Sequence, residues 1–394
     1  MITMKTKTAM TIVLVVFLTV CHADVKSQPV GRLVNETPVQ EQTYDPAYRP
    51  KLFLSLPNHL HNPDGMVYCK KTNKIFLTVP NFNRLDANLK KGNHEGGYLV
   101  MIDPETAAFE EVLKFPILAE TGQTGPLGLA FGPDGNLYVC DTQWFHSKDW
   151  KSRVLRVMMK DGKPTGEVQV VATGTKVSNA ILWLDDKMLV SDTYLELKGH
   201  YGTSGVWMFT KEEALTAGKN GVPTIALEPN GKDKRLIMIE PVIESMAWLP
   251  GGADGLTVDS KGVVYTCSFG DGAVFAITFD ADNKATRRRI FQHKNIQCLD
   301  NMVYDPRTNK IYMADSQLNA IHVMSTWEEG KPVVFETIWA NGDTDGSDGS
   351  LDSPSEPLII GNKLFVANFD SAGIPTMINT NHDAPHTISV ITLK

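Results

Sequence analysis

The chain repeats one pattern six times, and this repetition limits its fold more than any other feature. Each unit has a polar tip, a short apolar strand, a turn, and a second apolar strand that ends in a small or acidic residue. A third strand follows. The units begin at Pro63, Pro126, Val177, Ala253, Leu299 and Ser355. Their tips lie about 46 to 75 residues apart, a spacing typical of one four-stranded propeller blade with loops of variable length.

Six such units predict an all-β fold, a six-bladed β-propeller with four-stranded antiparallel blades, over residues 46–394. The segment Lys51–Leu56 has the pattern of a strand and lies before the first unit. The last unit has only one further strand, Thr387–Leu393, before the chain stops. We therefore expect the N-terminal strand to become the outer strand of the last blade, because closing the ring removes exposed sheet edges.

The residues before the repeats predict an exported protein. Basic residues precede the apolar run Ala9–Val20, and small residues typical of a cleavage site follow it, so residues 1–23 have the pattern of a signal peptide. The run is shorter than the roughly 20 apolar residues of a membrane span. Residues 24–45 are polar and predict a flexible leader. We expect a secreted or periplasmic protein, with a lipoprotein acylated at Cys21 as the alternative.

Charge and cysteine content exclude some functions and leave others open. The formal net charge of −7 argues against nucleic-acid binding, which needs a basic surface. The sequence contains no CxxC pair, so it does not favour a zinc ribbon. The four cysteines after the signal segment allow three disulfide pairings, and the sequence does not choose among them. These cysteines are Cys69, Cys140, Cys267 and Cys298. The oligomeric state is likewise not determined by the sequence.

The tips are the main candidates for function, because the innermost strand of each propeller blade starts near the central channel. The tip residues are Asp64, Gly128, Asn179, Asp254, Asp300 with Asn301, and Glu356. Carboxylate and amide oxygens crowded around one axis would repel each other or lie unsatisfied without a cation. Ca²⁺ takes roughly six to eight oxygen ligands of this kind, with Zn²⁺, Mg²⁺ or Mn²⁺ as alternatives.

A simpler interpretation is that each tip residue belongs to a turn that starts a strand. The recurrence of oxygen-bearing residues at equivalent positions favours a metal site over that interpretation. Turns would tend to repeat one residue, whereas the identities here differ from unit to unit. A separate acidic segment, Asp343–Gly349, resembles a calcium loop by composition, but it lacks the Glu of an EF-hand and is interpreted as a flexible acidic turn.

Several of the tips lie in segments that resemble the senescence-marker-protein/gluconolactonase family. Val177–Trp183 is similar to that family's Ser-Asn-Gly-Leu-x-Trp strand. Gly252–Asp259 resembles its Pro-Asp-Gly segment, and Ser355–Pro357 resembles its Glu-Gly-Pro motif. Leu299–Val303 looks like the Asp-Asn calcium segment of paraoxonases. The resemblance covers the repeat region, from about residue 50 to residue 394.

The resemblance implies a six-bladed propeller with one divalent metal on its axis that hydrolyses a lactone or related ester. It implies that the metal ligands are Glu356, Asn179, Asp254, Asp300 and Asn301. Asp254 would also be the catalytic base or nucleophile. The family's Glu usually lies in the first blade, whereas Glu356 lies in the last, so Asp64 is the alternative for that role.

Loops that follow the second strands, together with the first tip, supply candidates for substrate binding. The candidates are Asp64, His146, His200 and Trp144. Trp144, Phe145, Tyr194 and Tyr201 could wall a pocket for a small-molecule lactone or ester, or simply pack over the ring. The alternative functions are other chemistry on the same fold, such as organophosphate hydrolysis or a strictosidine-synthase-like condensation, and a binding propeller without enzymatic activity.

Overall fold

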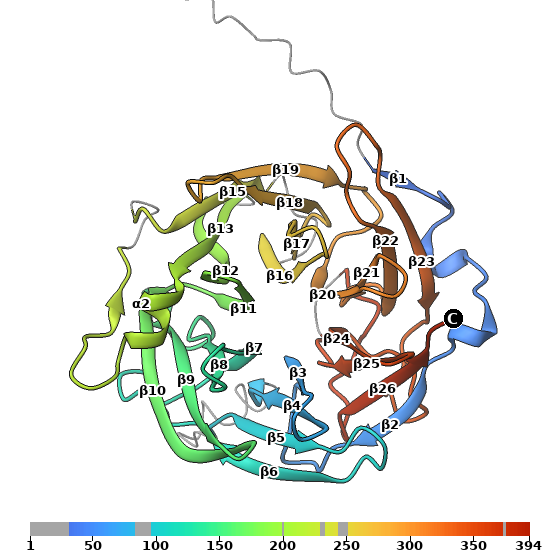
Figure 1. Cartoon of the computed structure of the whole chain (residues 1–394). Helices are drawn as coiled ribbons and strands as arrows, with labels where there is room; N and C mark the ends of the chain where they lie inside the picture. Colours follow the sequence, from blue (N-terminus) through green and yellow to red (C-terminus); the bar gives the residue numbers. More distant parts are fainter. Residues whose placement is uncertain (1–30, 83–95, 199–200, 229–232, 243–250, 373–375) are drawn as a thin grey trace, which may run out of the picture.

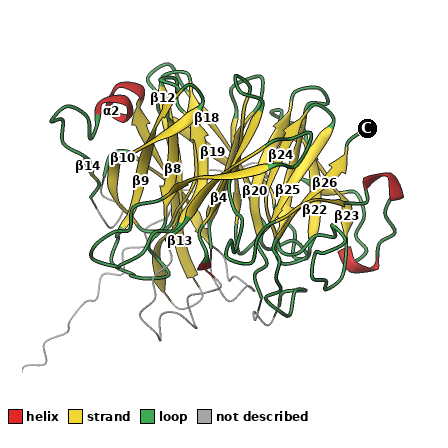
Figure 2. Ribbon diagram, turned by 90° about the horizontal axis from the view of Figure 1, so that it is seen from below, coloured by secondary structure: helices red, strands yellow, loops and turns green. Residues whose placement is uncertain are grey.

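The computed structural model describes residues 31–82, 96–198, 201–228, 233–242, 251–372 and 376–394. Six sheets stand around a central axis (Figure 1), which confirms the predicted six-bladed β-propeller. A view from the side shows loops at both ends of the blades (Figure 2). The predicted signal peptide lies outside the described residues. Within them, no helix is both long and apolar enough to cross a membrane.

Each blade has four antiparallel strands, and the first strand in the chain is the innermost in blades one to five, whereas in blade six the N-terminal strand is the outermost. Blade one comprises β3 (Met66–Cys69), β4 (Lys74–Val79), β5 (Tyr98–Ile102) and β6 (Phe109–Lys114). Blade two comprises β7 (Pro126–Phe131), β8 (Leu137–Asp141), β9 (Ser152–Lys160) and β10 (Lys163–Thr175). Blade three comprises β11 (Ser178–Leu184), β12 (Lys187–Lys198), β13 (Tyr201–Thr210) and β15 (Leu236–Val242).

The second half of the ring follows the same order. Blade four comprises β16 (Ala253–Val258), β17 (Val264–Ser268), β18 (Val274–Phe279) and β19 (Ala285–Phe291). Blade five comprises β20 (Leu299–Asp305), β21 (Lys310–Asp315), β22 (Ala320–Ser325) and β23 (Val334–Ala340). Blade six comprises β24 (Pro354–Ile360), β25 (Lys363–Asn368), β26 (Thr387–Thr392) and the N-terminal β2 (Lys51–Ser55).

The ring closes as the sequence predicts. Strand β2 pairs antiparallel with β26, from Lys51 opposite Val390 to Ser55 opposite Thr387. Phe53 of β2 contacts Phe365 of β25 edge to face, with 4.8 Å between the ring centroids. Blade six is therefore built from both ends of the described chain, and its outer edge is paired rather than left open.

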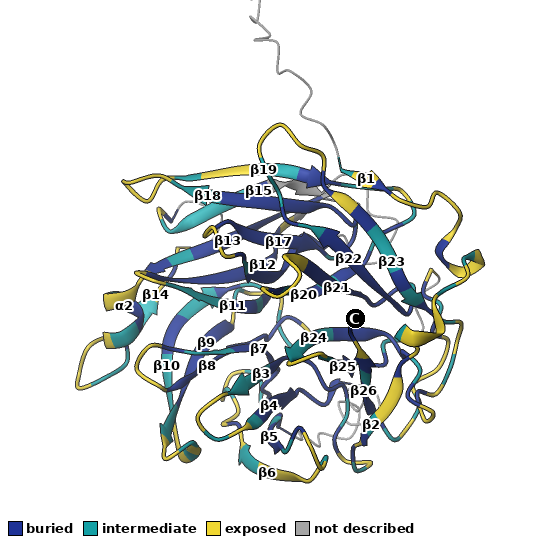
Figure 3. Cartoon of the chain, turned by 45° about the vertical axis from the view of Figure 1, so that its right-hand side comes forward, coloured by how far each residue is buried: buried dark blue, intermediate teal, exposed yellow. Residues whose placement is uncertain are grey.

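The core lies between neighbouring blades. Every residue of β8 and of β17 is buried. Both faces of these second strands pack against adjacent blades, which explains why they read as continuous apolar runs rather than alternating patterns. Figure 3 shows the buried residues on the inner strands and exposed residues at the blade rims. The largest fully buried side chains include Trp207, Tyr138 and Tyr265.

Short strands pair with the outermost strands of blades two and five. The described part of the predicted leader includes β1 (Arg32–Leu33), which pairs in parallel with β23, and the 3₁₀ helix Val39–Glu41; a second 3₁₀ helix, Pro46–Tyr48, follows the leader. On blade two, β14 (Ile225–Ala226) pairs in parallel with β10. The helix α2 (Lys211–Thr216) begins with a capping box between Thr210 and Glu213.

Burial of Leu54 in β2 should stabilise the closed ring. Leu54 is 8% exposed and Leu52 is 41% exposed in the same strand. We expect Leu54→Ala to lower the free energy of unfolding by about 2 to 4 kcal/mol, because it leaves a cavity between two strands. Leu52→Ala, the matched control, should cost less than about 0.5 kcal/mol. Urea unfolding of both variants checks this, and equal losses would contradict the proposed role of β2.

Candidate functional site

A β-bulge begins the innermost strand in five of the six blades. In blade four Ala253 pairs with Ser268, and the next pair joins Leu256 to Thr266, so the inner strand holds one extra residue. The same step occurs in blades two, three, five and six. The bulged residues are Leu127–Gly128, Asn179–Ala180, Asp254–Gly255, Asp300–Asn301 and Ser355–Glu356. Bulges often redirect side chains beside functional sites, and here they hold the predicted tip residues.

Glycines beside the tips let neighbouring blades approach closely. A Cβ atom on Gly128 would lie 2.4 Å from the backbone oxygen of Asn179. One on Gly255 would lie 2.5 Å from Oδ1 of Asn301. At either position a side chain would push two strand starts apart. The glycines therefore allow the tips of separate blades to share one small volume.

The structure brings together five of the predicted residues, which we call the axial group: Asp64, Asp254, Asp300, Asn301 and Glu356. The Asn301 amide nitrogen donates to Oε2 of Glu356. The Ser316 hydroxyl donates to Oδ2 of Asp300 over 2.9 Å. Asp254, Asp64 and Asn301 are only 2%, 7% and 6% exposed. Carboxylates from blades one, four, five and six thus lie within reach of one another's charge.

Burial and mutual repulsion perturb these carboxyl groups. Burial raises the pKa of Asp254 well above its usual range, and the charges of Asp300, Asp64 and Glu356 raise it further. The pKa of Glu356 is raised by burial and then by Asp64 and Asp300. Burial raises the pKa of Asp300 to about 7, against the Ser316 hydrogen bond. Each of these groups would hold a negative charge only with a compensating partner nearby.

The axial group has no such partner in the described part of the chain. No described Lys, Arg or His forms an ion pair with its carboxylates, and Oδ1 of Asp254 is buried without a hydrogen-bond donor. A buried, unpaired carboxylate oxygen is costly unless a proton or a cation compensates it. Carboxylate and amide oxygens suit a hard divalent cation, so the residues fit such an ion. Among the described residues, however, no three His, Cys, Asp or Glu side chains already form a metal-binding group.

Asn179 occupies the predicted position but is not shown in contact with the carboxylates. It lies in the bulge of β11, and its backbone faces Gly128 of the neighbouring blade. Its placement among the ligands remains a prediction.

A second set of acidic residues, at the ends of the second strands, has a structural role. Asp192 accepts hydrogen bonds from the backbone nitrogens of Lys176 and Val177 and from the indole nitrogen of Trp207. The equivalent positions in other blades are Asp141, Asp315 and the amide Asn368. Asp141 and Asn368 accept hydrogen bonds from the loops before β7 and β24, and Asp315 accepts one from the loop after β21. Their oxygens are satisfied by the protein itself, in contrast to Oδ1 of Asp254.

An aromatic group adjoins the axial carboxylates. Trp144 stacks on Tyr194, with 5.3 Å between centroids and 19° between planes. Phe145 meets Trp144 edge to face, and the Lys148 ammonium lies 2.8 Å from the Trp144 ring centroid. The negative charge of Asp254 contributes to the raised pKa of Tyr194, after burial, which places this phenol near the axis. No described residue accepts a hydrogen bond from the Tyr194 hydroxyl or from the Trp144 indole nitrogen.

The predicted histidines have different outcomes. His146 follows Trp144 and Phe145, and its ring lies 6.3 Å from that of Phe82. His200 lies outside the described residues. The structure adds a pair that the sequence analysis did not predict, because Nδ1 of His61 lies 3.0 Å from Nε2 of His386 in blade six. The two residues are 325 positions apart, and no sequence motif links them.

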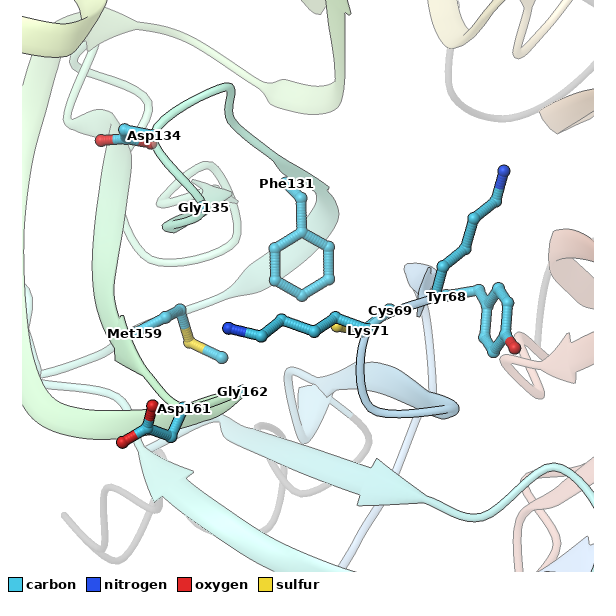
Figure 4. A pocket seen from close by; sticks show the side chains of 10 residues that line it. Tyr68, Cys69, Lys71, Phe131, Asp134, Gly135, Met159, Asp161 and Gly162 are labelled. Carbon is cyan, nitrogen blue, oxygen red and sulfur yellow. The ribbon is translucent and has the colours of Figure 1, made fainter.

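A cavity of about 380 Å³ lies elsewhere, between blades one and two (Figure 4). Its walls come from hairpin turns that include Lys71, Gly135 and Gly162, with Phe131 and Met159 beside them. The turns at Lys71 and Gly135 follow the inner strands β3 and β7, and the turn at Gly162 joins β9 to β10. The cavity contains none of the predicted site residues, so it is not part of this site.

Comparison with known proteins identifies the family. The model of the SMP-30/gluconolactonase/LRE-like region matches residues 81–299, more than half of the chain. The chain belongs to this family. The match confirms the resemblance predicted from the sequence, and it spans the bulges of blades two, three and four. A search of curated proteins gives no match.

Solved structures similar to this SMP-30/gluconolactonase family member share its fold. A Thermus thermophilus protein described as an oxidoreductase (glucose dehydrogenase) has 13% identity and a TM-score of 0.54, covering 88% of this chain and 99% of its own. The PQQ-bound aldose sugar dehydrogenase of Streptomyces coelicolor has 14% identity and a TM-score of 0.53, covering 87% and 97%. The calcium-binding protein regucalcin of Agrobacterium tumefaciens has 11% identity and a TM-score of 0.48, covering 87% and 92%. At these identities the likenesses to the two dehydrogenases show the fold alone.

The two kinds of aspartate should respond oppositely to neutralisation in the presence of a chelator. Asp192→Asn should destabilise the protein by about 1 to 3 kcal/mol, because it disturbs buried hydrogen bonds. Asp254→Asn should leave stability unchanged or raise it, because it removes an uncompensated buried acid. Thermal unfolding of both variants checks this. A comparable loss in the two variants would show that Asp254 is held by the protein after all.

Proposed function

We propose that this protein is an exported, metal-dependent hydrolase that opens a lactone or related carboxylic ester at its axial group. The observation that carries the proposal is Oδ1 of Asp254, a buried carboxylate oxygen without a donor among the described residues, in a member of the SMP-30/gluconolactonase family. Export rests on the N-terminal sequence pattern alone. A propeller that served only as a binding scaffold would have no need of this unpaired carboxylate.

The cation would be held by Glu356, Asn179, Asp254, Asp300 and Asn301, and their oxygen atoms favour Ca²⁺. The charge of Asp64 raises the pKa of Glu356, so the two carboxylates lie close together. Both can therefore contribute to the cation site, rather than one replacing the other. When bound, a divalent cation polarises the ester carbonyl and stabilises the negative charge that develops on its oxygen.

The protein's own groups supply the remaining chemistry. Oδ1 of Asp254 has a free lone pair with which to accept a proton from an attacking water or to attack the carbonyl itself. Asn301 and Ser316 act as positioning residues, because they donate hydrogen bonds to Glu356 and Asp300 and so fix these carboxylates. The burial of Asp254 and Asp64 keeps bulk water from these two carboxylates.

The aromatic group supports a small-molecule substrate. Trp144 and Tyr194 stack on one another near Asp254, with Lys148 over the Trp144 ring, and each has an unpartnered polar hydrogen among the described residues. A substrate that accepts a hydrogen bond from one of these groups would satisfy it. Asp64, His146 and His200 remain proposed contacts for the substrate.

Turnover should depend on both the cation and Asp254. We expect a chelator to abolish hydrolysis in a panel of aldonolactones, aryl esters and organophosphates, and Asp254→Asn to lower kcat/KM by roughly 10²–10⁴-fold with cation restored. Asp282→Asn is the matched control, because Asp282 is exposed in a turn of the same blade. Unchanged turnover in the chelated protein and in Asp254→Asn would exclude the mechanism.

The Tyr194 hydroxyl should contact the substrate rather than stabilise the fold. Tyr194→Phe removes only this hydroxyl, so we expect thermal stability to be kept and kcat/KM to fall by roughly tenfold, the value of one hydrogen bond. Tyr304→Phe is the control, because its hydroxyl bonds Ser260 and Asn309 at the surface. Steady-state kinetics measure both variants, and equal kcat/KM in the two would remove Tyr194 from the site.

A further inference from the structure

A second group of acidic residues lies between blades five and six, outside the axial group. Two loops carry it, one between β23 and β24 and the other between β25 and β26. We call it the blade-six acidic cluster, and its members are Asp343, Asp345, Asp352, Asp370 and Asp383. The acidic segment Asp343–Gly349 noted in the sequence forms one side of it.

Two of these carboxylates are deeply buried. Asp352 is 4% exposed and Asp370 is fully buried. Burial raises the pKa of Asp352 to about 9, with added repulsion from Asp370, Asp383 and Asp343. No described Lys, Arg or His forms an ion pair with Asp352. His386 lies 3.6 Å from Asp370, but burial lowers the pKa of His386 to about 3, so this imidazole is neutral at ordinary pH.

Two buried side chains of the cluster and its surroundings carry oxygen atoms without a hydrogen-bond donor among the described residues. Oδ1 of Asp352 and Oδ1 of Asn379 are buried without hydrogen-bond donors among the described residues. Asn379 is 1% exposed, and its amide nitrogen donates to Oδ1 of Asp370 at 2.8 Å and to the Ser371 carbonyl at 3.0 Å. These two bonds fix the orientation of the amide, because a flipped amide would set oxygen against oxygen. The side-chain oxygen of Asn379 can therefore accept a hydrogen bond or bind a cation, and no described residue donates to it.

We propose that the blade-six acidic cluster binds a divalent cation, Ca²⁺ by its ligand chemistry, through Asp352, Asp370 and the Asn379 amide oxygen, with Asp343 and Asp383 completing the site. Carboxylate and amide oxygens are the ligands that Ca²⁺ prefers. No group of three acidic or histidine side chains is already arranged as a metal site among the described residues, so the ion must draw these carboxylates together on binding.

The position of the cluster indicates what the ion would stabilise. The acidic loop packs on the closing strand, since a Cβ atom on Gly349 would lie 1.8 Å from the backbone nitrogen of Leu52 in β2. On the other side, the backbone nitrogen of Leu56 donates to the His386 carbonyl just before β26. A cation here would tie both loops of blade six to the seam where the ring closes. It would act on stability, independently of hydrolysis at the axial group.

Calcium binding to the metal-free full chain tests the proposal by equilibrium dialysis. We expect Asp352→Asn to bind one Ca²⁺ fewer per chain than the wild type, and the number bound at the cluster to be unchanged in Asp254→Asn. Asp348→Asn is the matched control, because Asp348 lies in the same loop but is exposed and faces Arg49. Equal stoichiometry and affinity in the wild type and Asp352→Asn would overturn the proposal.

Thermal unfolding supplies a second readout. Ca²⁺ should raise the Tm of the wild type and of Asp254→Asn in a concentration-dependent way, and in the Asp254→Asn background this increase should be largely lost when Asp352→Asn is added. Without Ca²⁺, Asp352→Asn should unfold at the same or a higher temperature than the wild type, because it removes an uncompensated charge. A lower Tm without Ca²⁺ would instead show that Asp352 belongs to a hydrogen-bond network and would refute the site.

A milder variant keeps the test decisive if Asp352→Asn does not fold. The exposed Asp343 accepts hydrogen bonds from Thr380 and contributes to the field at Asp352. Asp343→Asn should fold normally and bind Ca²⁺ at this site with an affinity lower by roughly tenfold, as loss of one charged ligand predicts. An affinity equal to that of Asp348→Asn would count against the cluster as a cation site.

Discussion

The convergence of six strand starts on one axis is the constraint on which the rest of this structure depends. A ring of blades brings the first residues of its inner strands together whatever their chemistry, and bulges with adjacent glycines draw them closer still. In this chain the convergent residues are mostly acidic, so the fold itself concentrates like charges in a buried volume. Such an arrangement is unfavourable for stability alone. We interpret this buried group of acidic residues as the proposed cation site.

The same residue type serves two purposes in neighbouring blades. Asp192 in β12 holds the loop before β11 through two hydrogen bonds and accepts a third from Trp207, whereas Asp254 begins an inner strand and leaves one oxygen unused by the described residues. What separates them is the supply of donors. Loop backbone nitrogens donate to Asp192, while no described residue donates to Oδ1 of Asp254. The number of acidic residues therefore does not identify the site. The structural carboxylates have hydrogen-bond donors from the protein, whereas Oδ1 of Asp254 has none among the described residues.

Much of the fold could be predicted from the sequence because the information is local and repeated. Each unit states its own strands and turn, and the unpaired strand at Lys51–Ser55 matches the strand missing from blade six. The tips could be predicted for the same reason. The His61–His386 contact could not, because it depends on how the first and last blades meet. The burial of Asp352 could not be predicted either, because the composition around Asp345 and Asp348 suggests a solvated turn. Asp352 is nevertheless buried, in a loop that packs on β2 at Gly349.

The closing strand also dictates an order of assembly. Strand β2 is made before the first blade, yet its partner β26 follows all the other blade strands, so the N-terminal segment must stay unpaired while the rest of the ring is synthesised. Contacts between such distant segments are slow to form. Until they pair, β2 and β26 are open strand edges that can also pair between different molecules. Correct folding of this propeller thus depends on its last step, in which pairing of β2 with β26 in the same chain competes with pairing between two chains.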